Sequence, residues 1–185
     1  MPSRKPRTTE TDLPDLILPI EERDHRRGRL GAKYSLVEYG DYESEHCAHL
    51  EPVVGELIRE LGDDLCYAFR NFPVSDEHPN AQRAAEAAEA ADLQAKFWLM
   101  HERLFGNQIE LSDAIIRDIA SDLPLEMDTF ARDLASGVPT RRVAEDVESA
   151  QEAGVEETPT LFVNGRLSTG SYEFLPLLKE LTGER

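Results

Sequence analysis

The chain has 185 residues, enough for one domain of ordinary size or one domain with an inserted subdomain. Hydrophobic residues make up 40% of it, which is sufficient for a core and argues against global disorder. The net charge of −17, from 20 basic and 37 acidic residues, argues against nucleic acid and anionic membrane surfaces as partners.

The amino-terminal segment is polar and rich in proline, and we expect residues 1–20 to form a flexible arm. Its basic residues are not followed by an apolar run, so the sequence predicts no secretory signal. No stretch of the chain is long and apolar enough to span a bilayer. These features predict a cytoplasmic protein with no membrane partner. Residues 21–29, EERDHRRGR, carry dense charge of both signs and predict a solvated segment.

The first regular elements are a strand, a helix and a second strand. Residues 34–39, YSLVEY, form a short run of β-branched and aromatic types and predict a buried strand. A helix follows, because apolar residues from Cys47 to Leu61 recur on one stripe at helical spacing. Gly62 ends this helix. The second strand is predicted over residues 65–70, LCYAFR.

The rest of the chain predicts a helical block followed by a hairpin. Residues 79–153 are nearly all helical in pattern and begin with an alanine-rich stretch. A short strand at 160–163 leads into the turn sequence Asn164-Gly165 and a return strand at 166–169. A helix at 172–181 closes the chain. The order predicts an α/β fold whose first two strands are parallel and whose hairpin is antiparallel.

Three segments resemble the DsbA-like branch of the thioredoxin superfamily: LVEYGDYESEHCAHLEP, HPNAQRAAEAAEAADLQAKFWLMHERLF and TPTLFVNGR. They occur in the family's order, and the similarity extends over about residues 20–183. The resemblance implies a thioredoxin-like mixed sheet with an inserted helical subdomain, and membership of a thiol–disulfide oxidoreductase family. The implied parts are an amino-terminal half at 21–78, a helical insertion at 79–153 and a carboxy-terminal half at 154–185.

The chain departs from this family at the redox motif. Members carry Cys-x-x-Cys where this chain has Ser44-Glu45-His46-Cys47. The family's chemistry needs an exposed thiolate at a helix N-terminus and a second, more buried thiol that resolves the mixed disulfide. A serine hydroxyl forms no disulfide, so we expect impaired dithiol exchange. Cys47 should face the core, where burial raises a thiol's pKa, and Cys66 should be an inert strand residue too distant to pair with it.

Other parts of the site match the family pattern. The resemblance implies that Glu38 is a buried acid assisting proton transfer at Cys47; the alternative is an ordinary glutamate on a solvated strand face. His46 fills the slot of a histidine that stabilises the first thiolate, or is merely an exposed residue of the first helical turn. Thr158-Pro159 matches the cis-proline loop that binds an extended peptide; the alternative is a trans proline starting an edge strand.

Ser44 has two interpretations. It could be an N-cap whose hydroxyl accepts a backbone hydrogen bond. Alternatively, it could act as in kappa-class glutathione transferases, which share the DsbA-like fold and place a serine here that donates a hydrogen bond to the glutathione thiolate.

Three functions follow. The chain could retain thiol-linked activity through Cys47, bind peptides without redox turnover, or act as a transferase through Ser44. The partner is accordingly a peptide or protein thiol substrate, or a small thiol. Glutathione or another low-molecular-weight thiol is the one cofactor left open. Spacing of histidine, cysteine and acidic residues predicts no metal site, and the sequence leaves the oligomeric state open.

Overall fold

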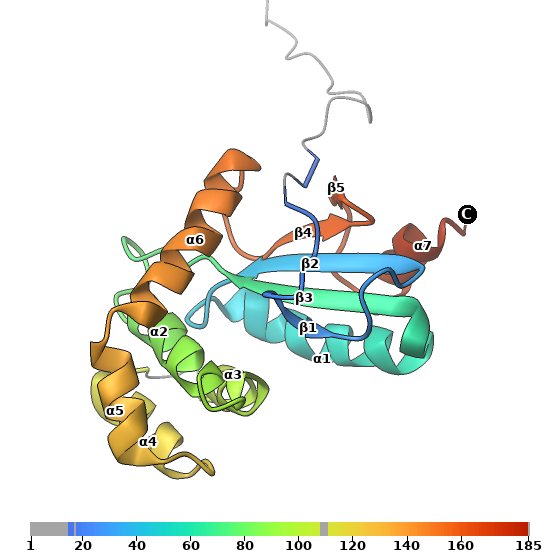
Figure 1. The fold of residues 1–185 in the computed structure, drawn as a ribbon. Helices are drawn as coiled ribbons and strands as arrows, with labels where there is room; N and C mark the ends of the chain where they lie inside the picture. The colour runs from blue at the N-terminus through green and yellow to red at the C-terminus, as the bar shows by residue number, and fades with distance from the viewer. Residues whose placement is uncertain (1–14, 17, 108–110, 185) are drawn as a thin grey trace, which may run out of the picture.

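A five-stranded mixed sheet organises the computed structural model, which describes residues 15–16, 18–107 and 111–184 (Figure 1). The strand order is β1-β3-β2-β4-β5. Strands β2 and β3 are parallel, and the other neighbouring pairs are antiparallel. This confirms the predicted thioredoxin-like mixed sheet. The strands are β1 (His25–Arg27), β2 (Tyr34–Gly40), β3 (Leu65–Asn71), β4 (Thr160–Val163) and β5 (Arg166–Leu167).

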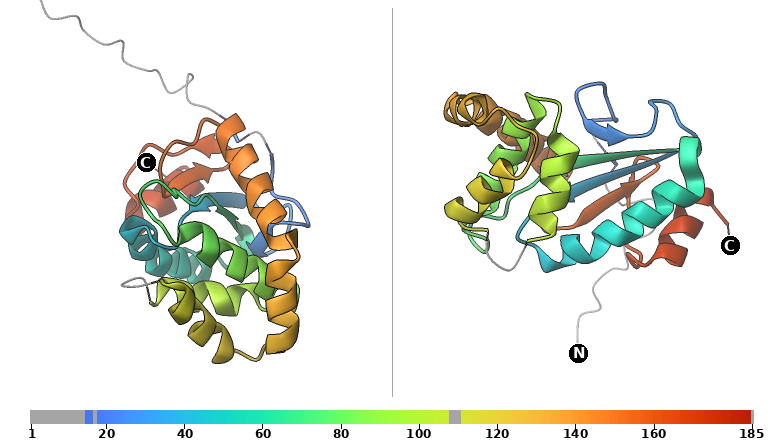
Figure 2. Two further views of the ribbon diagram at one scale, coloured as in Figure 1. Left: turned by 90° about the vertical axis from the view of Figure 1, so that its left-hand side faces the viewer. Right: turned by 90° about the horizontal axis from the view of Figure 1, so that it is seen from below.

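Helices pack on both faces of the sheet and gather beyond one end of it. Figure 2 shows α1 and α7 along one face and the helical block beyond the sheet end. Helix α6 contacts β3 and places Ala150 against the opposite face, where Ala153, the residue after the helix, also packs. The helices are α1 (Glu45–Leu61), α2 (Ala81–Asp92), α3 (Phe97–Phe105), α4 (Asp113–Ser121), α5 (Met127–Ala135), α6 (Val138–Glu152) and α7 (Phe174–Thr182). A 3-10 turn, Gly62–Asp64, joins α1 to β3.

Alternation along β2 divides its side chains between two cores. Leu36 belongs to the main core with α1, whereas Val37 and Tyr39 belong to a second cluster with α6. Successive strand residues point to opposite faces, so Glu38 shares the α1 face with Leu36. The same alternation places Tyr67 of β3 on the α1 face. The two strands therefore direct polar groups beneath the beginning of α1.

The prediction that residues 21–29 form a solvated segment is confirmed at both ends, where 21–23 and 28–29 are exposed, and is wrong at the centre. His25–Arg27 form the edge strand β1, which pairs antiparallel with β3. Asp24 and His25 are buried. Burial is tolerated because their charges and ring nitrogens have partners inside the protein: Asp24 pairs with Arg70, and His25 with Glu89. Periodicity alone could not reveal these partners, which are distant in the sequence.

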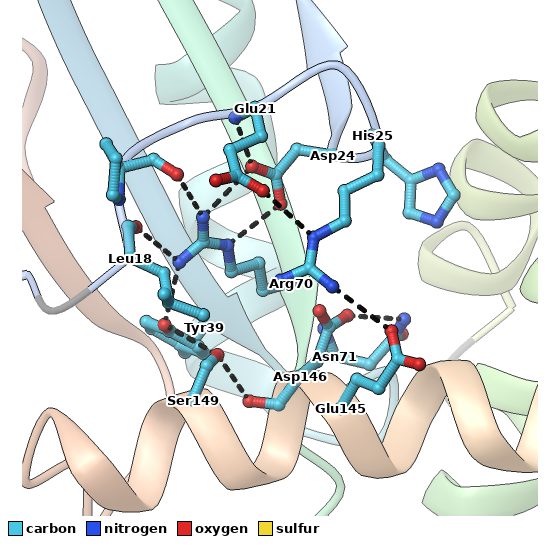
Figure 3. Close-up of polar contacts among 12 residues, drawn as sticks. Leu18, Glu21, Asp24, His25, Tyr39, Arg70, Asn71, Glu145, Asp146 and Ser149 are labelled. Carbon is cyan, nitrogen blue, oxygen red and sulfur yellow. Dashed lines mark hydrogen bonds and ion pairs between the residues drawn. The ribbon is translucent and has the colours of Figure 1, made fainter.

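Arg70 of β3 binds the segment that precedes β1 and holds it against the sheet (Figure 3). Its guanidinium donates to both carboxylate oxygens of Asp24 at 2.9 Å. It also donates to the backbone oxygens of Leu18 and Pro19, at 2.9 and 3.0 Å, and to the Tyr39 hydroxyl at 3.0 Å. Burial raises the pKa of Asp24, but the hydrogen bonds and charge of Arg70 outweigh it and hold that pKa below its usual range.

Other sequence expectations differ in extent. The return strand predicted to reach residue 169 ends at Leu167. The expected arm at 1–20 lies largely outside the described residues, which include 15, 16 and 18–20. In that described part, the Leu16 backbone N–H donates to the Gly165 oxygen at 2.9 Å.

We predict that Asp24→Asn costs about 3 kcal/mol of stability at pH 7, because it leaves a buried guanidinium without its counter-charge. The folded pKa of Asp24 is depressed, so its contribution is present above the unfolded pKa and lost as the pH falls through the folded value. Urea unfolding at pH 7 and pH 3 measures this. The difference between variant and wild type should shrink at pH 3. Exposed Asp63→Asn is the control, and an equal effect of both variants at pH 7 would contradict the prediction.

Candidate functional site

The site begins at the amino end of α1, where Ser44 is the N-cap. Its backbone is extended, and its Oγ accepts a hydrogen bond from the Cys47 backbone N–H at 3.4 Å. Ser44 precedes the helix because serine oxygen satisfies one of the unpaired N–H groups of the first turn. The N-cap interpretation of Ser44 is confirmed.

The Ser44 hydroxyl also contacts the loop that leads into β4. Its Oγ donates to the Thr158 carbonyl oxygen at 3.4 Å, across 114 positions of sequence. The Thr158–Pro159 peptide bond is cis. The Tyr172 hydroxyl donates to the Pro159 carbonyl oxygen at 3.0 Å and ties the loop to the segment before α7. The helix N-terminus and the proline loop, distant in sequence, therefore form one site.

Cys47 is fully buried beneath this site. Burial raises the pKa of its thiol well above the ordinary value, and the neighbouring Glu38 carboxyl raises it further. Cys66 is also buried, and burial raises its pKa as well. It lines a cavity of about 260 Å³ with Leu16 and Ile20, whereas Cys47 belongs to the α1 core. The two thiols are free and lie on opposite faces of the sheet.

Glu38 lies in the interior, so the alternative of a solvated strand face is wrong. The side chain is 0% exposed, and the Tyr67 hydroxyl donates to its Oε2 at 2.8 Å. Its Oε1 has no hydrogen-bond partner among the described residues. Burial raises the pKa of Glu38 well above its usual range, and the charge of Glu51 adds to the effect. Both groups below the helix start, this acid and Cys47, are thus held toward their neutral forms.

An open groove of about 620 Å³ lies beside Ser44. His46 is exposed and lines it, together with Thr158, Val74 and His78. Glutamates from three separate segments complete the lining. The groove is the feature that joins the exposed residues of the predicted site.

Sequence reasoning missed two acids that shape the groove. Asp41 Oδ2 accepts from the Val74 backbone N–H at 2.8 Å and lies 2.9 Å from His78 Nδ1. The Glu43 carboxylate accepts from the backbone and side-chain nitrogens of Asn80, at 2.6 and 2.9 Å. Together they hold the segment before α2 against the start of α1. Their position between a buried strand and a helix N-cap was the available signal.

One histidine–carboxylate group in the described part of the chain has ligand atoms close enough to hold a metal: His25, Glu89 and Asp92. The His25 ring lies between the acids, with Nε2 2.8 Å from Glu89 and Nδ1 3.6 Å from Asp92. The ring stacks on Phe97, and the Asn71 amide donates to the same Glu89 oxygen. The carboxylates face different ring nitrogens, an arrangement that suits hydrogen bonding between β1 and α2 rather than shared coordination.

The fold and this site define a thioredoxin-like protein, and the comparisons agree. The thioredoxin family profile matches residues 21–177. The chain therefore belongs to the thioredoxin family, and its inserted helices give it the DsbA-like form of that fold. No helix among the described residues combines the length and the apolar character needed to cross a membrane.

Solved structures share this fold at low sequence identity. BdbD from Bacillus subtilis, in its oxidised form, is 22% identical with a TM-score of 0.75, over 92% of this chain and 97% of that one. A thioredoxin-like oxidoreductase from Silicibacter pomeroyi is 23% identical with a TM-score of 0.78, over 88% and 92%. The thiol–disulfide exchange protein α-DsbA2 from Wolbachia pipientis is 21% identical with a TM-score of 0.78, over 89% of each chain.

Curated relatives with higher identity are longer proteins. The Na(+)/H(+) antiporter NhaA 1 of Salinispora arenicola is 44% identical over 169 residues, which are 91% of this chain and 26% of that protein. NhaA 1 of Mycolicibacterium gilvum is 40% identical over 92% of this chain and 28% of its own length. The chain thus spans about a quarter of the length of these relatives.

We predict that both thiols react slowly with iodoacetamide in the folded protein at pH 7. Their raised pKa values leave little thiolate, so alkylation should be at least ~10-fold slower than for an exposed model thiol. Mass spectrometry of Cys47→Ala and Cys66→Ala follows each thiol separately, and unfolding in urea should restore ordinary rates. Rapid alkylation of folded Cys47 would contradict the prediction.

We predict that Ser44→Cys restores a disulfide with Cys47, because residue 44 caps the helix whose first turn holds Cys47. Oxidation of the variant, followed by thiol titration in denaturant, should show the loss of one pair of thiols. Ser44→Cys with Cys47→Ala is the matched control and should lose none within one molecule. An unchanged thiol count in the first variant would show that the site does not have redox-motif geometry.

Proposed function

We propose that this thioredoxin-family chain binds an extended peptide or protein segment in the groove beside Thr158-Pro159, without dithiol exchange. The supporting observation is the joining of Ser44, through its hydroxyl, to the Thr158 carbonyl oxygen at the edge of an open groove. That arrangement retains a binding surface where the attacking thiol of the family is replaced by an alcohol.

Backbone geometry supports peptide binding. Among the described residues, no hydrogen-bond acceptor is found for the backbone N–H of Thr158, which immediately precedes β4. An extended peptide can satisfy such a group by adding main-chain hydrogen bonds along the strand direction. The groove supplies space for the side chains of that peptide.

The redox alternative is less well supported. Cys47 would have to act alone, yet it is fully buried with a raised thiol pKa. Its thiolate is therefore scarce, and a partner disulfide could not reach it without opening the site.

The transferase alternative also meets an obstacle. Ser44 is 4% exposed, and its hydroxyl donates to Thr158 instead of pointing its proton into the groove. The acidic groove lining is also unfavourable for anionic glutathione. We nevertheless retain glutathione as the ligand that tests this alternative.

The similarity to sodium–proton antiporters suggests a partner for the groove. We propose that the peptide-binding groove serves a sodium–proton antiporter, within one polypeptide or as a separate partner, at the cytoplasmic side. Two free thiols agree with a reducing compartment. The test is a pull-down. The Salinispora arenicola antiporter is truncated to remove the quarter that matches this chain, solubilised in detergent and immobilised on an affinity resin. The resin should then capture this chain from solution. Failure of that capture would contradict the antiporter context and leave groove binding to the next test.

We predict that Val74→Trp blocks peptide binding, because the larger side chain fills the groove that Val74 lines. A library of fluorescent extended peptides, read by anisotropy, identifies a binder, and the variant should weaken it at least about tenfold. Leu175→Trp, at a 63% exposed position on α7, is the matched control and should bind as wild type.

Two negative results complete this test. Insulin reduction by the wild type should not exceed the background rate, and glutathione should give no heat in calorimetry. Glutathione binding that Ser44→Ala abolishes would favour the transferase, and the absence of any bound peptide would overturn the proposed function.

A further inference from the structure

The rim of the groove carries unusual charge for a peptide-binding surface. Four exposed glutamates come from three segments: Glu45 from the first turn of α1, Glu77 from the segment before α2, and Glu156 with Glu157 from the segment before the cis proline. Lysine and arginine are absent from the groove lining among the described residues. The described lining of the groove therefore carries an excess of negative charge.

The four carboxylates make no stabilising polar contacts with the described residues of the protein. Within the described ranges, none of the four carboxylate groups is in an ion pair or accepts a hydrogen bond; the Thr160 hydroxyl donates to the backbone oxygen of Glu157 and not to its carboxylate. Glu43, also in the lining, differs because it is bonded to Asn80. Like charges placed around one groove without counter-charges repel one another. A bound cation of matching shape would reduce this repulsion.

A metal ion does not match this arrangement. Among the described residues, the rim glutamates are not part of any group whose ligand atoms lie within metal-binding distance of one another. Carboxylates contributed by separate segments around one groove instead match positive charges spaced along a chain.

We propose that the groove selects an extended peptide segment carrying lysine or arginine on both sides of the residue placed beside Thr158. This rests on the proposed function, which supplies the groove and the backbone contact. Glu156 and Glu157 lie directly before Thr158 in the sequence and bind one flank of the peptide. Glu45 and Glu77, which come from two other segments of the groove lining, bind the other flank. Charge then sets the choice of partner, and main-chain hydrogen bonding sets its extended form.

The test uses three fluorescent peptides of equal length with the same apolar positions. Their remaining positions are lysine and arginine in the first, serine and glutamine in the second, and glutamate in the third. Anisotropy titrations with the intact chain should rank them basic, neutral, acidic, and binding of the basic peptide should weaken as salt screens the charges. Glu156→Gln with Glu157→Gln should weaken the basic peptide by about 3–10-fold and leave the neutral one unchanged.

A charge-matched control separates local charge from net charge. Glu60→Gln with Asp63→Asn removes the same charge near the far end of α1, about 24 Å from Ser44 along a helix of 17 residues. This variant should bind the basic peptide nearly as wild type does. Equal loss in both double variants would overturn the local selection and show a general effect of net charge.

The outcomes distinguish the two proposals. Equal binding of all three peptides, blocked by Val74→Trp, would overturn charge selection while supporting peptide binding at the groove. Binding of none of the three, with no binder in the wider library, would overturn the proposed function itself. Preference for the basic peptide that survives both Val74→Trp and Glu156→Gln/Glu157→Gln would place the cation site elsewhere and contradict the inference.

Discussion

A single hydroxyl links the two halves of the site. Ser44 Oγ accepts from the backbone of the first turn of α1 and donates to the carbonyl before Pro159. The first bond fixes where the helix begins, and the second fixes where the loop entering β4 lies against it. A cysteine at this position would supply nucleophilic chemistry; the serine supplies capping and a contact between segments. The groove lies beside that contact, next to the Thr158 backbone N–H, for which the described part of the chain offers no acceptor.

The buried ionisable groups behave differently on the two faces of the sheet. On the α6 face, Asp24 and Arg70 are both ionised and held together by two hydrogen bonds, which attach the amino-terminal segment to β3. On the α1 face, neither Glu38 nor Cys47 is paired with a cation among the described residues, and burial raises both pKa values. The Asp24–Arg70 pair stabilises the fold because each charge has its partner inside the protein. Burial on the α1 face favours the neutral forms of the two groups below Ser44, which suits thiolate chemistry poorly.

The sequence predicted the fold well because hydrophobic periodicity reports on packing faces. The strand at 34–39, the stripe beginning at Cys47 and the hairpin at Asn164-Gly165 each follow from local pattern. The edge strand at His25 was missed because its charged residues are typical of a surface segment. Its burial depends on partners such as Arg70 and Glu89, which are distant in the sequence. Groove-shaping contacts from Asp41 were missed for the same reason, since they join residues more than thirty positions apart.

The central claim is that the surface beside Thr158 is a peptide-binding site that works without a thiolate. The most direct measurement is the backbone amide resonance of Thr158 in a ¹⁵N-labelled sample during titration with a bound peptide. We predict that its shift and its exchange protection change most, together with resonances of Ser44 and His46, while both cysteines remain reduced. Changes confined to the cavity beside Cys66, or a covalent adduct at Cys47, would contradict the account.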